Sequence, residues 1–179
     1  MNSGKKKIQL SDRLSAVAAL VPKGSKVADV GCDHGFVSIY LVQQGFATKV
    51  IAMDVNEGPL QRAVSHVKEA GLEEEIECRL SDGLKKVTFA DEIDCTIMAG
   101  MGGKLMEKII SEALGRNLVI QNLVLQPQSD WSSLRKFLRE NRYIISEEKM
   151  VLDEGKYYPM MRVCHGTARP EHLDYDSDL

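Results

Sequence analysis

The segment DVGCDHG, residues 29–35, combines two glycines with two acidic residues. Gly31 and Gly35 let the backbone approach a ligand closely, and a following helix would offer its N-terminal N–H groups. The gap of three residues between these glycines differs from the G-x-G-x-x-G pattern of dinucleotide sites. Asp29 precedes the first glycine by two positions, where a carboxylate would repel a pyrophosphate and attract a cation. The segment therefore predicts a nucleotide-type pocket for a positively charged ligand.

Two further acids close β-prone runs, Asp54 after residues 49–53 and Asp82 after residues 75–80. S-adenosylmethionine is a suitable cation because it carries an ammonium and a sulfonium and has no phosphate. In an α/β sheet Asp54 would accept from ribose hydroxyls, and Asp82 would accept from the adenine amino group. We therefore predict that Asp29, Asp54 and Asp82 line one crevice that binds this cofactor. Each acid taken alone is equally well explained as a turn or cap residue.

The segment AGMGG, residues 99–103, follows the fourth β-prone run. Amino-group methyltransferases of DNA and RNA typically show Asn or Asp there, followed by Pro-Pro and an aromatic residue. The absence of that tetrapeptide disfavours methylation of an exocyclic amine. A glycine-rich backbone would let a flat ring or the methyl donor lie close to it, and a plain strand-to-helix turn is the simpler alternative.

The order of the expected elements places these residues at one edge of a sheet. After a short helix with Ser11 as its N-cap, five β-prone runs alternate with four helical runs: 26–30, 49–53, 75–80, 94–98 and 118–125 for strands, and 34–44, 57–70, 104–113 and 130–141 for helices. Such alternation predicts a parallel sheet covered on both faces. The β-type runs 143–152 and 156–164 are linked by residues 153–155, a connection that allows only an antiparallel hairpin. We therefore predict an α/β, Rossmann-like class I methyltransferase fold with a mixed seven-stranded sheet and a C-terminal antiparallel hairpin.

Composition narrows the class of protein. The 179 residues are 44% hydrophobic and 27% charged, which predicts one domain with a real core. A net charge of −3 excludes a histone-like protein that holds nucleic acid by bulk positive charge. No apolar stretch approaches the roughly 20 residues of a membrane helix, and the polar start does not resemble a signal peptide, so we expect a cytoplasmic protein. Four scattered cysteines predict neither a disulfide framework nor a metal site.

Six segments together resemble the bacterial tRNA (adenine-22-N1)-methyltransferase family: LSDRL (10–14), DVGCDHGFVSIYLV (29–42), GPL (58–60), RLSDGL (79–84), IMAGMGG (97–103) and LQP (125–127). The resemblance runs from about residue 10 to 164. It implies S-adenosylmethionine-dependent methylation of N1 of an adenine in the D-arm region of tRNA. At the positions of residues 31–38 (GCDHGFVS) the family usually has Gly-Ser-Asp-His-Ala-Tyr-Leu-Pro. This chain therefore differs at Cys32, Gly35, Phe36, Val37 and Ser38, and Gln128 replaces the usual Asn after LQP. Family members usually continue into a C-terminal helical extension, so we expect residues 1–165 to be the methyltransferase domain and the acidic residues 166–179 to begin such an extension.

The resemblance gives Asp29 as the motif-I acid and Arg13 as the family's N-terminal arginine, and we predict that these two are catalytic. Asp29 would stabilise the cationic adenine or accept an N6 proton, or alternatively it only shapes the cofactor site; Arg13 would hold a phosphate. The predicted cofactor-binding residues are Gly31, Asp33, His34, Gly35, Asp54, Asp82, Gly83, Ala99, Gly100 and Met101. The predicted substrate-binding residues are Phe36, Gly102, Gly103, Gln126, Pro127, Tyr157, Arg135, Arg139 and Arg142.

A tRNA adenine must turn out of its stack to react, and Phe36, Met101 and Tyr157 are the candidate stacking partners. Core packing is the alternative for each. For the phosphates, we predict a basic stripe of Arg135, Arg139 and Arg142 on one helix face and a second cluster of lysines at positions 5–7. The predicted partner is tRNA, with no membrane and no metal, and the expected state is a monomer. The alternatives are a small-molecule methyltransferase and a non-catalytic tRNA-binding protein of the same fold.

Overall fold

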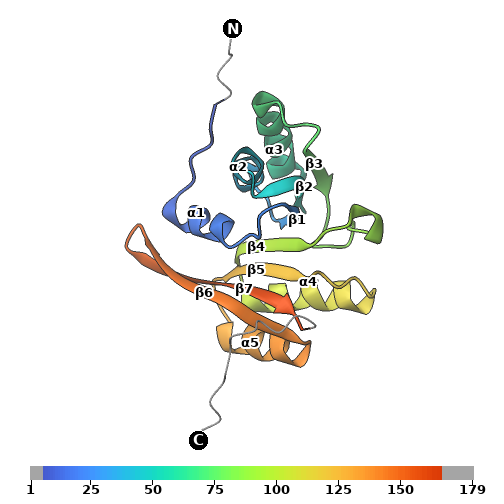
Figure 1. Ribbon diagram of the computed structural model, residues 1–179, viewed down its shortest axis with the longest axis vertical. Coiled ribbons are helices and arrows are strands. Elements are labelled where there is room, and N and C mark those ends of the chain that lie inside the picture. The colour runs from blue at the N-terminus through green and yellow to red at the C-terminus, as the bar shows by residue number, and fades with distance from the viewer. Residues whose placement is uncertain (1–5, 167–179) are drawn as a thin grey trace, which may run out of the picture.

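The computed structural model describes residues 6–166, in which seven strands form one sheet (Figure 1). The strands are β1 (Ser25–Val30), β2 (Ala47–Asp54), β3 (Ile76–Leu80), β4 (Cys95–Met101), β5 (Asn122–Pro127), β6 (Tyr143–Asp153) and β7 (Lys156–His165). Their order is β3-β2-β1-β4-β5-β7-β6, with the first five parallel and β7 antiparallel to both neighbours. The predicted mixed sheet with a C-terminal hairpin is confirmed. Of the predicted acidic tail, residues 167–179 lie outside the described residues.

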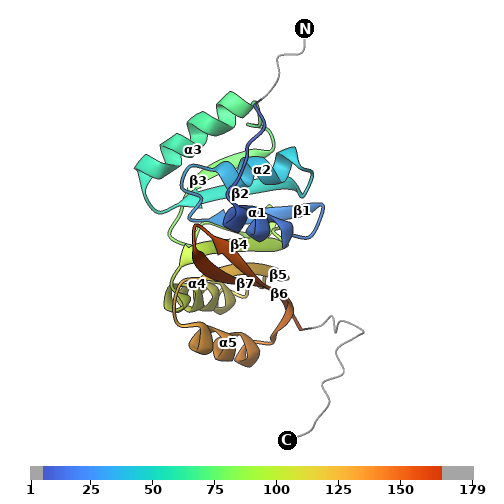
Figure 2. The same cartoon turned by 90° about the vertical axis from the view of Figure 1, so that its left-hand side faces the viewer.

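Helices cover both faces of this sheet (Figures 1 and 2). They are α1 (Asp12–Ala19), α2 (Phe36–Gln43), α3 (Glu57–Ala70), α4 (Gly103–Gly115) and α5 (Trp131–Glu140), and a short 3₁₀ turn, η1 (Phe89–Asp91), precedes β4. Ser11 caps α1 as predicted, because its hydroxyl accepts from the N–H of Leu14 at 3.3 Å. The first three helices pack on one face and the last two on the other, which is the arrangement that alternating elements predict.

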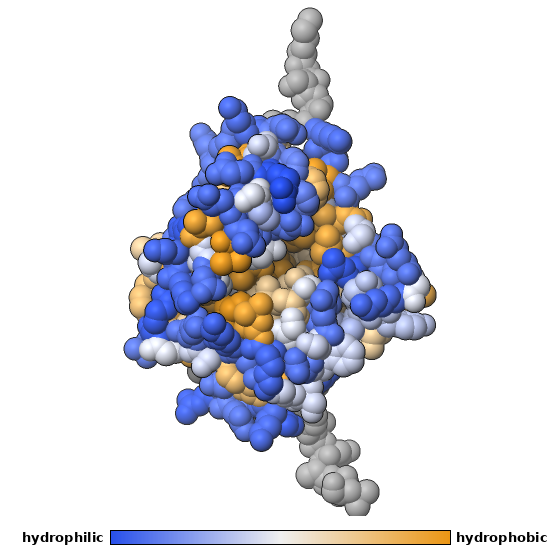
Figure 3. Space-filling view, turned by 180° about the vertical axis from the view of Figure 1, so that it is seen from behind, coloured by the Kyte–Doolittle hydropathy of each residue, from blue (hydrophilic) through white to orange (hydrophobic). Residues whose placement is uncertain are grey.

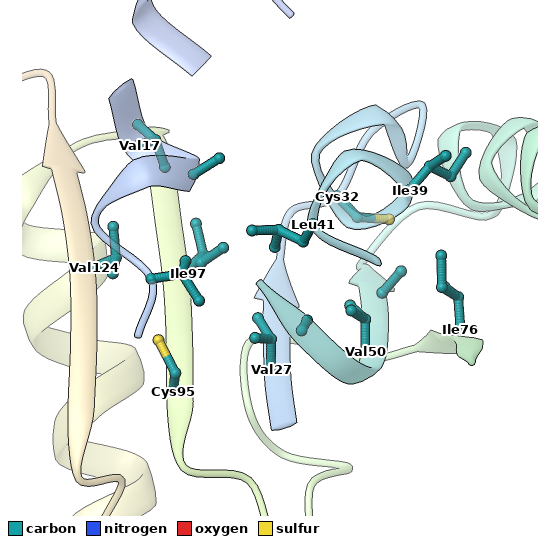
Figure 4. Packing of buried hydrophobic residues seen from close by; sticks show 14 of the residues in the cluster. Val17, Val27, Cys32, Ile39, Leu41, Val50, Ile76, Cys95, Ile97 and Val124 are labelled. Carbon is teal, nitrogen blue, oxygen red and sulfur yellow. The ribbon is translucent and has the colours of Figure 1, made fainter. Parts of the chain in front are cut away.

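Two apolar cores flank the sheet because successive side chains of a strand point to opposite faces. In β4, Ile97 joins the core under α1 to α3, and Met98 joins the core under α4 and α5. Figure 4 shows Ile97 beside Val124 of the neighbouring strand, with Val17 of α1 above them. On the face that Figure 3 shows, the surface is mainly hydrophilic, and apolar side chains gather in a central hollow. Both faces of the central strands are therefore buried. These strands are held in place by the two cores, and only their ends are open to form a site.

Most observed boundaries differ from the predicted ones by one to three residues, and two of the differences have a clear structural cause. The helix predicted from residue 34 begins at Phe36, because Gly35 adopts a left-handed conformation at φ 75° as its N-cap. The strand predicted over 118–125 is observed over 122–127. Leu118 and Ile120 are buried without being in a strand, and the N–H of Leu118 bonds back to the carbonyl of Ala113 at 2.9 Å. Their apolar character reflects burial beside α4 rather than extended structure.

Candidate active site

A cavity of about 330 Å³ opens at the carboxyl ends of β1 and β4. Ligands of open α/β sheets bind at this edge, beside the point where the strand order reverses between β1 and β4. Eight of the predicted site residues line the cavity: Arg13, Asp29, Gly31, Asp33, His34, Phe36, Ala99 and Gly100. Its lining also includes residues that sequence reasoning did not select: Leu14, Val30, Cys32, Val37, Ile97 and Gln128.

Asp29 is the buried acid of this cavity, with 5% of its surface exposed. Its carboxylate accepts a hydrogen bond from the hydroxyl of Ser38 in α2 at 2.7 Å. Burial raises the pKa of Asp29 to about 6; the Ser38 hydrogen bond lowers the pKa and the nearby charge of Asp54 raises it. A carboxylate that is costly to ionise is stabilised by a positive group placed beside it. The cavity is therefore suited to a cationic ligand.

Arg13 brings a positive charge from α1 to the lining of the cavity. Its guanidinium donates to the side-chain oxygen of Gln126 at 2.7 Å and lies over the ring of Tyr158, 5.3 Å from the ring centre. The backbone N–H of Arg13 also donates to the carboxylate of Asp153 at 3.1 Å. Gln126 is 1% exposed, so its observed role is to orient Arg13 rather than to face a substrate. The lining of the cavity thus contains both an acid, Asp29, and a cation, Arg13.

The glycines at the strand ends serve two different purposes. A Cβ added at Gly100, φ 75°, would lie 3.6 Å from the Arg13 guanidinium, so this glycine lies against the cavity. By contrast, a Cβ at Gly35 would lie 3.0 Å from Ala63 of α3, and one at Gly83 would lie 2.9 Å from Ile109. At Gly103 it would lie 2.6 Å from the carbonyl oxygen of Ser129. Close packing between elements explains these last three glycines without a ligand.

Asp54 closes β2 next to the cavity but outside its lining. It is 8% exposed, and its two carboxylate oxygens accept from the N–H groups of Asp33 at 3.2 Å and Asn56 at 2.9 Å. Asp54 therefore joins the loop after β1 to the loop after β2. Each carboxylate oxygen has a second lone pair, so both oxygens keep capacity for a ligand.

Asp82 lies after β3 and differs from Asp54 in its surroundings. Its side chain is 53% exposed and forms an ion pair with Lys85, and that hydrogen bond holds the pKa of Asp82 below its usual range. Asp82 also lies outside the cavity lining. The three acids therefore do not share one cavity in the described residues: Asp29 lines it, Asp54 supports its rim and Asp82 lies beyond.

The candidate stacking residues separate in the same way. Phe36 lines the cavity and is 38% exposed, and its ring stacks on His66 at a centroid distance of 4.6 Å and on His34 at 5.6 Å. Met101 and the predicted substrate residue Gly102 lie outside the cavity lining; the Met101 side chain packs near Gly31, and a Cβ at Gly102 would meet the hydroxyl of Ser129. The third stacking candidate, Tyr157, lines a separate pocket together with the predicted substrate residues Gln126 and Pro127.

The prediction of one basic stripe on α5 is wrong for Arg142. The helix ends at Glu140, and Arg142 adopts φ 64° in the turn before β6. Its carbonyl accepts from Gly166, beside the start of β5 and hence at the end of the sheet remote from the cavity. Arg135 forms an ion pair with Glu148 of β6. Only Arg139 remains as an exposed arginine near the end of the helix, so the three residues do not form a common face.

Residues 6–166 contain no group of His, Cys, Asp and Glu side chains that could hold a metal ion. The four cysteines are free thiols, with Cys32 and Cys95 buried, and burial raises the pKa of both. Among the same residues no helix has the length and apolar character needed to cross a membrane.

Comparisons with known proteins agree with this geometry. Residues 10–161 match a family model described as a methyltransferase domain. The chain is 33% identical over 154 residues to the tRNA (adenine(22)-N(1))-methyltransferase of Bacillus subtilis, covering 86% of this chain and 64% of that protein. A putative tRNA (m1A22) methyltransferase of Streptococcus pneumoniae, solved with S-adenosyl-L-methionine, is 37% identical with a TM-score of 0.85, covering 90% of this chain and 75% of that one.

A third relative, the Mycoplasma capricolum TrmK structure with S-adenosyl-homocysteine, is 27% identical with a TM-score of 0.79, covering 92% of this chain and 73% of that one. The chain thus spans 64% of the length of the curated Bacillus subtilis protein and 73% to 75% of the length of the two solved relatives. The matched segment includes both the buried Asp29 and the strand ends that form the cavity. The chain therefore belongs to the methyltransferase domain family and, within it, to the bacterial tRNA (adenine-22-N1)-methyltransferase family.

Proposed function

We propose that the chain is an S-adenosylmethionine-dependent enzyme that methylates N1 of an adenine in the D-arm region of tRNA. The observation that carries the proposal is the buried carboxylate of Asp29 in a cavity at the carboxyl ends of the parallel strands. Family membership supports the choice of tRNA adenine as the substrate. We further propose that the protein acts in the cytoplasm as a monomer.

The described residues fit S-adenosylmethionine by their chemistry. Asp29 offers negative charge to an ammonium or sulfonium, and Asp54 keeps acceptor capacity for a ribose diol. Arg13 is the cation available in the cavity for a carboxylate or a phosphate. The left-handed conformations of Gly31 and Gly100 leave backbone without side chains on the cavity wall.

When bound, S-adenosylmethionine supplies an electrophilic methyl group on its sulfonium. The work of the chain is then mainly to position two ligands and to exclude water. Phe36 offers an aromatic face to the adenine, and Asp29 stabilises positive charge as N1 becomes alkylated. Because Phe36 lacks the hydroxyl of the tyrosine usual in the family, it can stack but cannot donate a hydrogen bond.

The direct test is to incubate the protein with labelled S-adenosylmethionine and an unmodified tRNA transcript, and then to map the labelled nucleoside. We expect label as 1-methyladenosine at one position of the D-arm region. A transcript with that adenosine replaced by guanosine is the matched control and should remain unlabelled. Label on a small molecule instead of RNA would favour the small-molecule methyltransferase, and RNA binding without label would favour a non-catalytic binding protein.

We expect the electrostatic grip on RNA to lie near the cavity rather than on α5. Lys6 and Lys7 line a pocket of about 380 Å³ that shares Phe36 with the cavity, whereas Arg142 lies at the far end of the sheet. Lys5, the third member of the predicted lysine cluster, lies outside the described residues.

Replacing Lys6 and Lys7 together by alanine should weaken tRNA binding and reduce the slope of log affinity against log salt by about 1 to 2, since each phosphate contact contributes about 0.7 to 0.9. The matched control is the double replacement of Arg139 and Arg142, which removes the same charge and should leave the slope within about 0.5. Filter binding of the transcript at several salt concentrations measures both. Equal slopes for the two double variants would remove the lysines from the RNA interface.

A further inference from the structure

A second pocket, of about 90 Å³, lies where β5 ends and α5 begins. Its wall combines the end of β5 and the loop after it with Trp131 of α5 and the first four residues of β7. Gln128 lines both this pocket and the larger cavity. The two depressions are therefore neighbours on the surface, and a substrate that fills the cavity passes close to the second pocket.

Two aromatic side chains of this pocket are exposed to solvent. Trp131 is 47% exposed and Tyr157 is 66% exposed. The indole N–H of Trp131 donates to the carbonyl of Pro127 at 2.8 Å, which fixes the ring against the end of β5. A large aromatic ring that is held in place and still open to water is ready to stack without a further cost of ordering it.

A positive charge accompanies the two rings. Lys156 lines the same pocket, is exposed, and lies with its ammonium 5.4 Å from the centre of the Tyr158 ring. Within residues 6–166 the ammonium of Lys156 has no carboxylate within ion-pair distance. Aromatic faces beside an unpaired cation are the usual elements of a site for a single-stranded nucleotide, because the base stacks and the phosphate meets the charge.

We propose that Trp131, Tyr157 and Lys156 form an aromatic subsite that binds a nucleotide next to the target adenosine of the RNA. The inference rests on the proposed function, since it takes the occupant of the larger cavity to be an RNA adenosine. The base stacks on Trp131 or Tyr157, and the phosphate lies near the Lys156 ammonium. The subsite helps to hold the strand open while the adenine is in the cavity. It also changes the role of Tyr157, which stacks on a neighbouring base rather than on the target.

Trp131 is the only tryptophan of the chain, so its fluorescence reports directly on the subsite. The experiment titrates the full chain with an unmodified D-arm RNA transcript and follows tryptophan emission, in parallel with methylation kinetics. We expect saturable quenching of the emission. Tyr157→Ala should raise the KM for RNA about tenfold, which lies within the range for loss of one stacked base, with kcat changed less than twofold. Affinity for S-adenosylmethionine should not change.

Two control variants distinguish the loss of ring stacking at Tyr157 from the loss of any exposed aromatic side chain. Tyr157→Phe keeps the ring and should retain a KM near that of the wild type. Phe89→Ala removes another exposed aromatic residue, 68% exposed in the short turn before β4, and should also leave KM unchanged. A Tyr157→Phe variant as defective as Tyr157→Ala would contradict stacking at this position.

Other outcomes overturn the subsite or the proposed function separately. Methylation with constant tryptophan emission and a wild-type KM for Tyr157→Ala removes the subsite and leaves the function intact. If the wild type methylates no RNA, the proposed function is wrong and the subsite no longer has a target adenosine beside it. Saturable quenching would then show only that RNA contacts the aromatic residues, and constant emission would overturn the subsite as well. Emission that changes with protein concentration in the absence of RNA would show that a second copy covers these rings, which also overturns it.

Discussion

Replacing Asp29 by asparagine should slow methyl transfer on the order of 100-fold, the effect typical of removing one electrostatic partner of the reacting centre. The affinity for tRNA should stay within about twofold, because Asp29 is buried in the cavity and does not face the phosphates. Single-turnover rates at saturating cofactor and RNA measure the first quantity, and filter binding measures the second. A variant that transfers methyl groups at the wild-type rate would leave Asp29 only a role in shaping the site.

The same carboxylate should make cofactor affinity depend on pH. The pKa of Asp29 is raised to about 6 in the folded protein, chiefly by burial. Below that pH the ligand-free protein holds Asp29 neutral, and a cation then gains nothing from it. Affinity for S-adenosylmethionine should therefore fall as pH decreases through about 6, and it should level off above about 7. Asp29→Asn should show a weak affinity with no such step.

Ser38→Ala offers a control that leaves the acid in place. The Ser38 hydroxyl donates to Asp29 at 2.7 Å and lowers the pKa of the carboxyl group. Its removal should move the midpoint of the pH dependence upward and leave the affinity at high pH nearly unchanged. A midpoint that does not move would assign the titration to another group.

Stability should change with pH in the opposite direction. Between the ordinary pKa of 3.8 and the folded value of about 6, the folded state binds more protons than the unfolded state, so the contribution of Asp29 to stability decreases as pH rises. Asp29→Asn should therefore gain stability relative to the wild type across this window, up to about 3 kcal/mol less the loss from a weaker, uncharged hydrogen bond with Ser38. Urea unfolding at pH 4.5 and pH 7.5 tests this difference.

Much of the fold could be predicted because its signals are local. Short β-prone runs alternate with helices, and the link of residues 153–155 permits only a hairpin, so the parallel strands and the antiparallel hairpin could be predicted. The order of the strands, with β7 between β5 and β6, was not predicted. The failures were also local. Leu118 and Ile120 are apolar because they are buried, and a short apolar run does not distinguish a strand from a buried loop.

The residues of the site could be predicted together only where they lie in one continuous segment of the chain. Gly31, Asp33 and Phe36 follow Asp29 directly along the chain and line the cavity with it. The orientation of Arg13, however, depends on Gln126, which is 113 residues away in the sequence, and no spacing encodes that contact.

A second source of ambiguity is that one residue type can serve more than one purpose. Gly83 and Gly103 were predicted to contact ligands, whereas a Cβ there would meet Ile109 and the backbone of Ser129. A sequence does not distinguish a glycine required for a ligand from one required for packing. Arg142 shows the same difficulty for charge, because the helix ends at Glu140 and Arg142 itself adopts a left-handed conformation in the turn that follows.

The ribose end of the cofactor should depend on Asp54, which closes β2 with both oxygens already accepting one backbone N–H each. Two further hydrogen bonds to a ribose diol would be charge-assisted and worth about 1.5 to 3 kcal/mol each. An asparagine keeps the size of the side chain but has one oxygen in place of two and no charge. It therefore loses at least one of the ribose bonds and weakens the join between the two loops.

We accordingly expect Asp54→Asn to raise the calorimetric Kd for S-adenosylmethionine by about 100-fold, with the free energy of unfolding measured beside it to correct for loosened loops. Glu57→Gln is the matched control, because it removes the same charge from an exposed residue in the first turn of α3, and it should change Kd less than threefold. Adenosine used as a competitor identifies the part of the ligand concerned: it should lose affinity for Asp54→Asn as S-adenosylmethionine does, whereas methionine should not. If both variants weakened binding equally, the effect would be general electrostatics around the cavity, and Asp54 would be left with the structural role of joining the loops after β1 and β2.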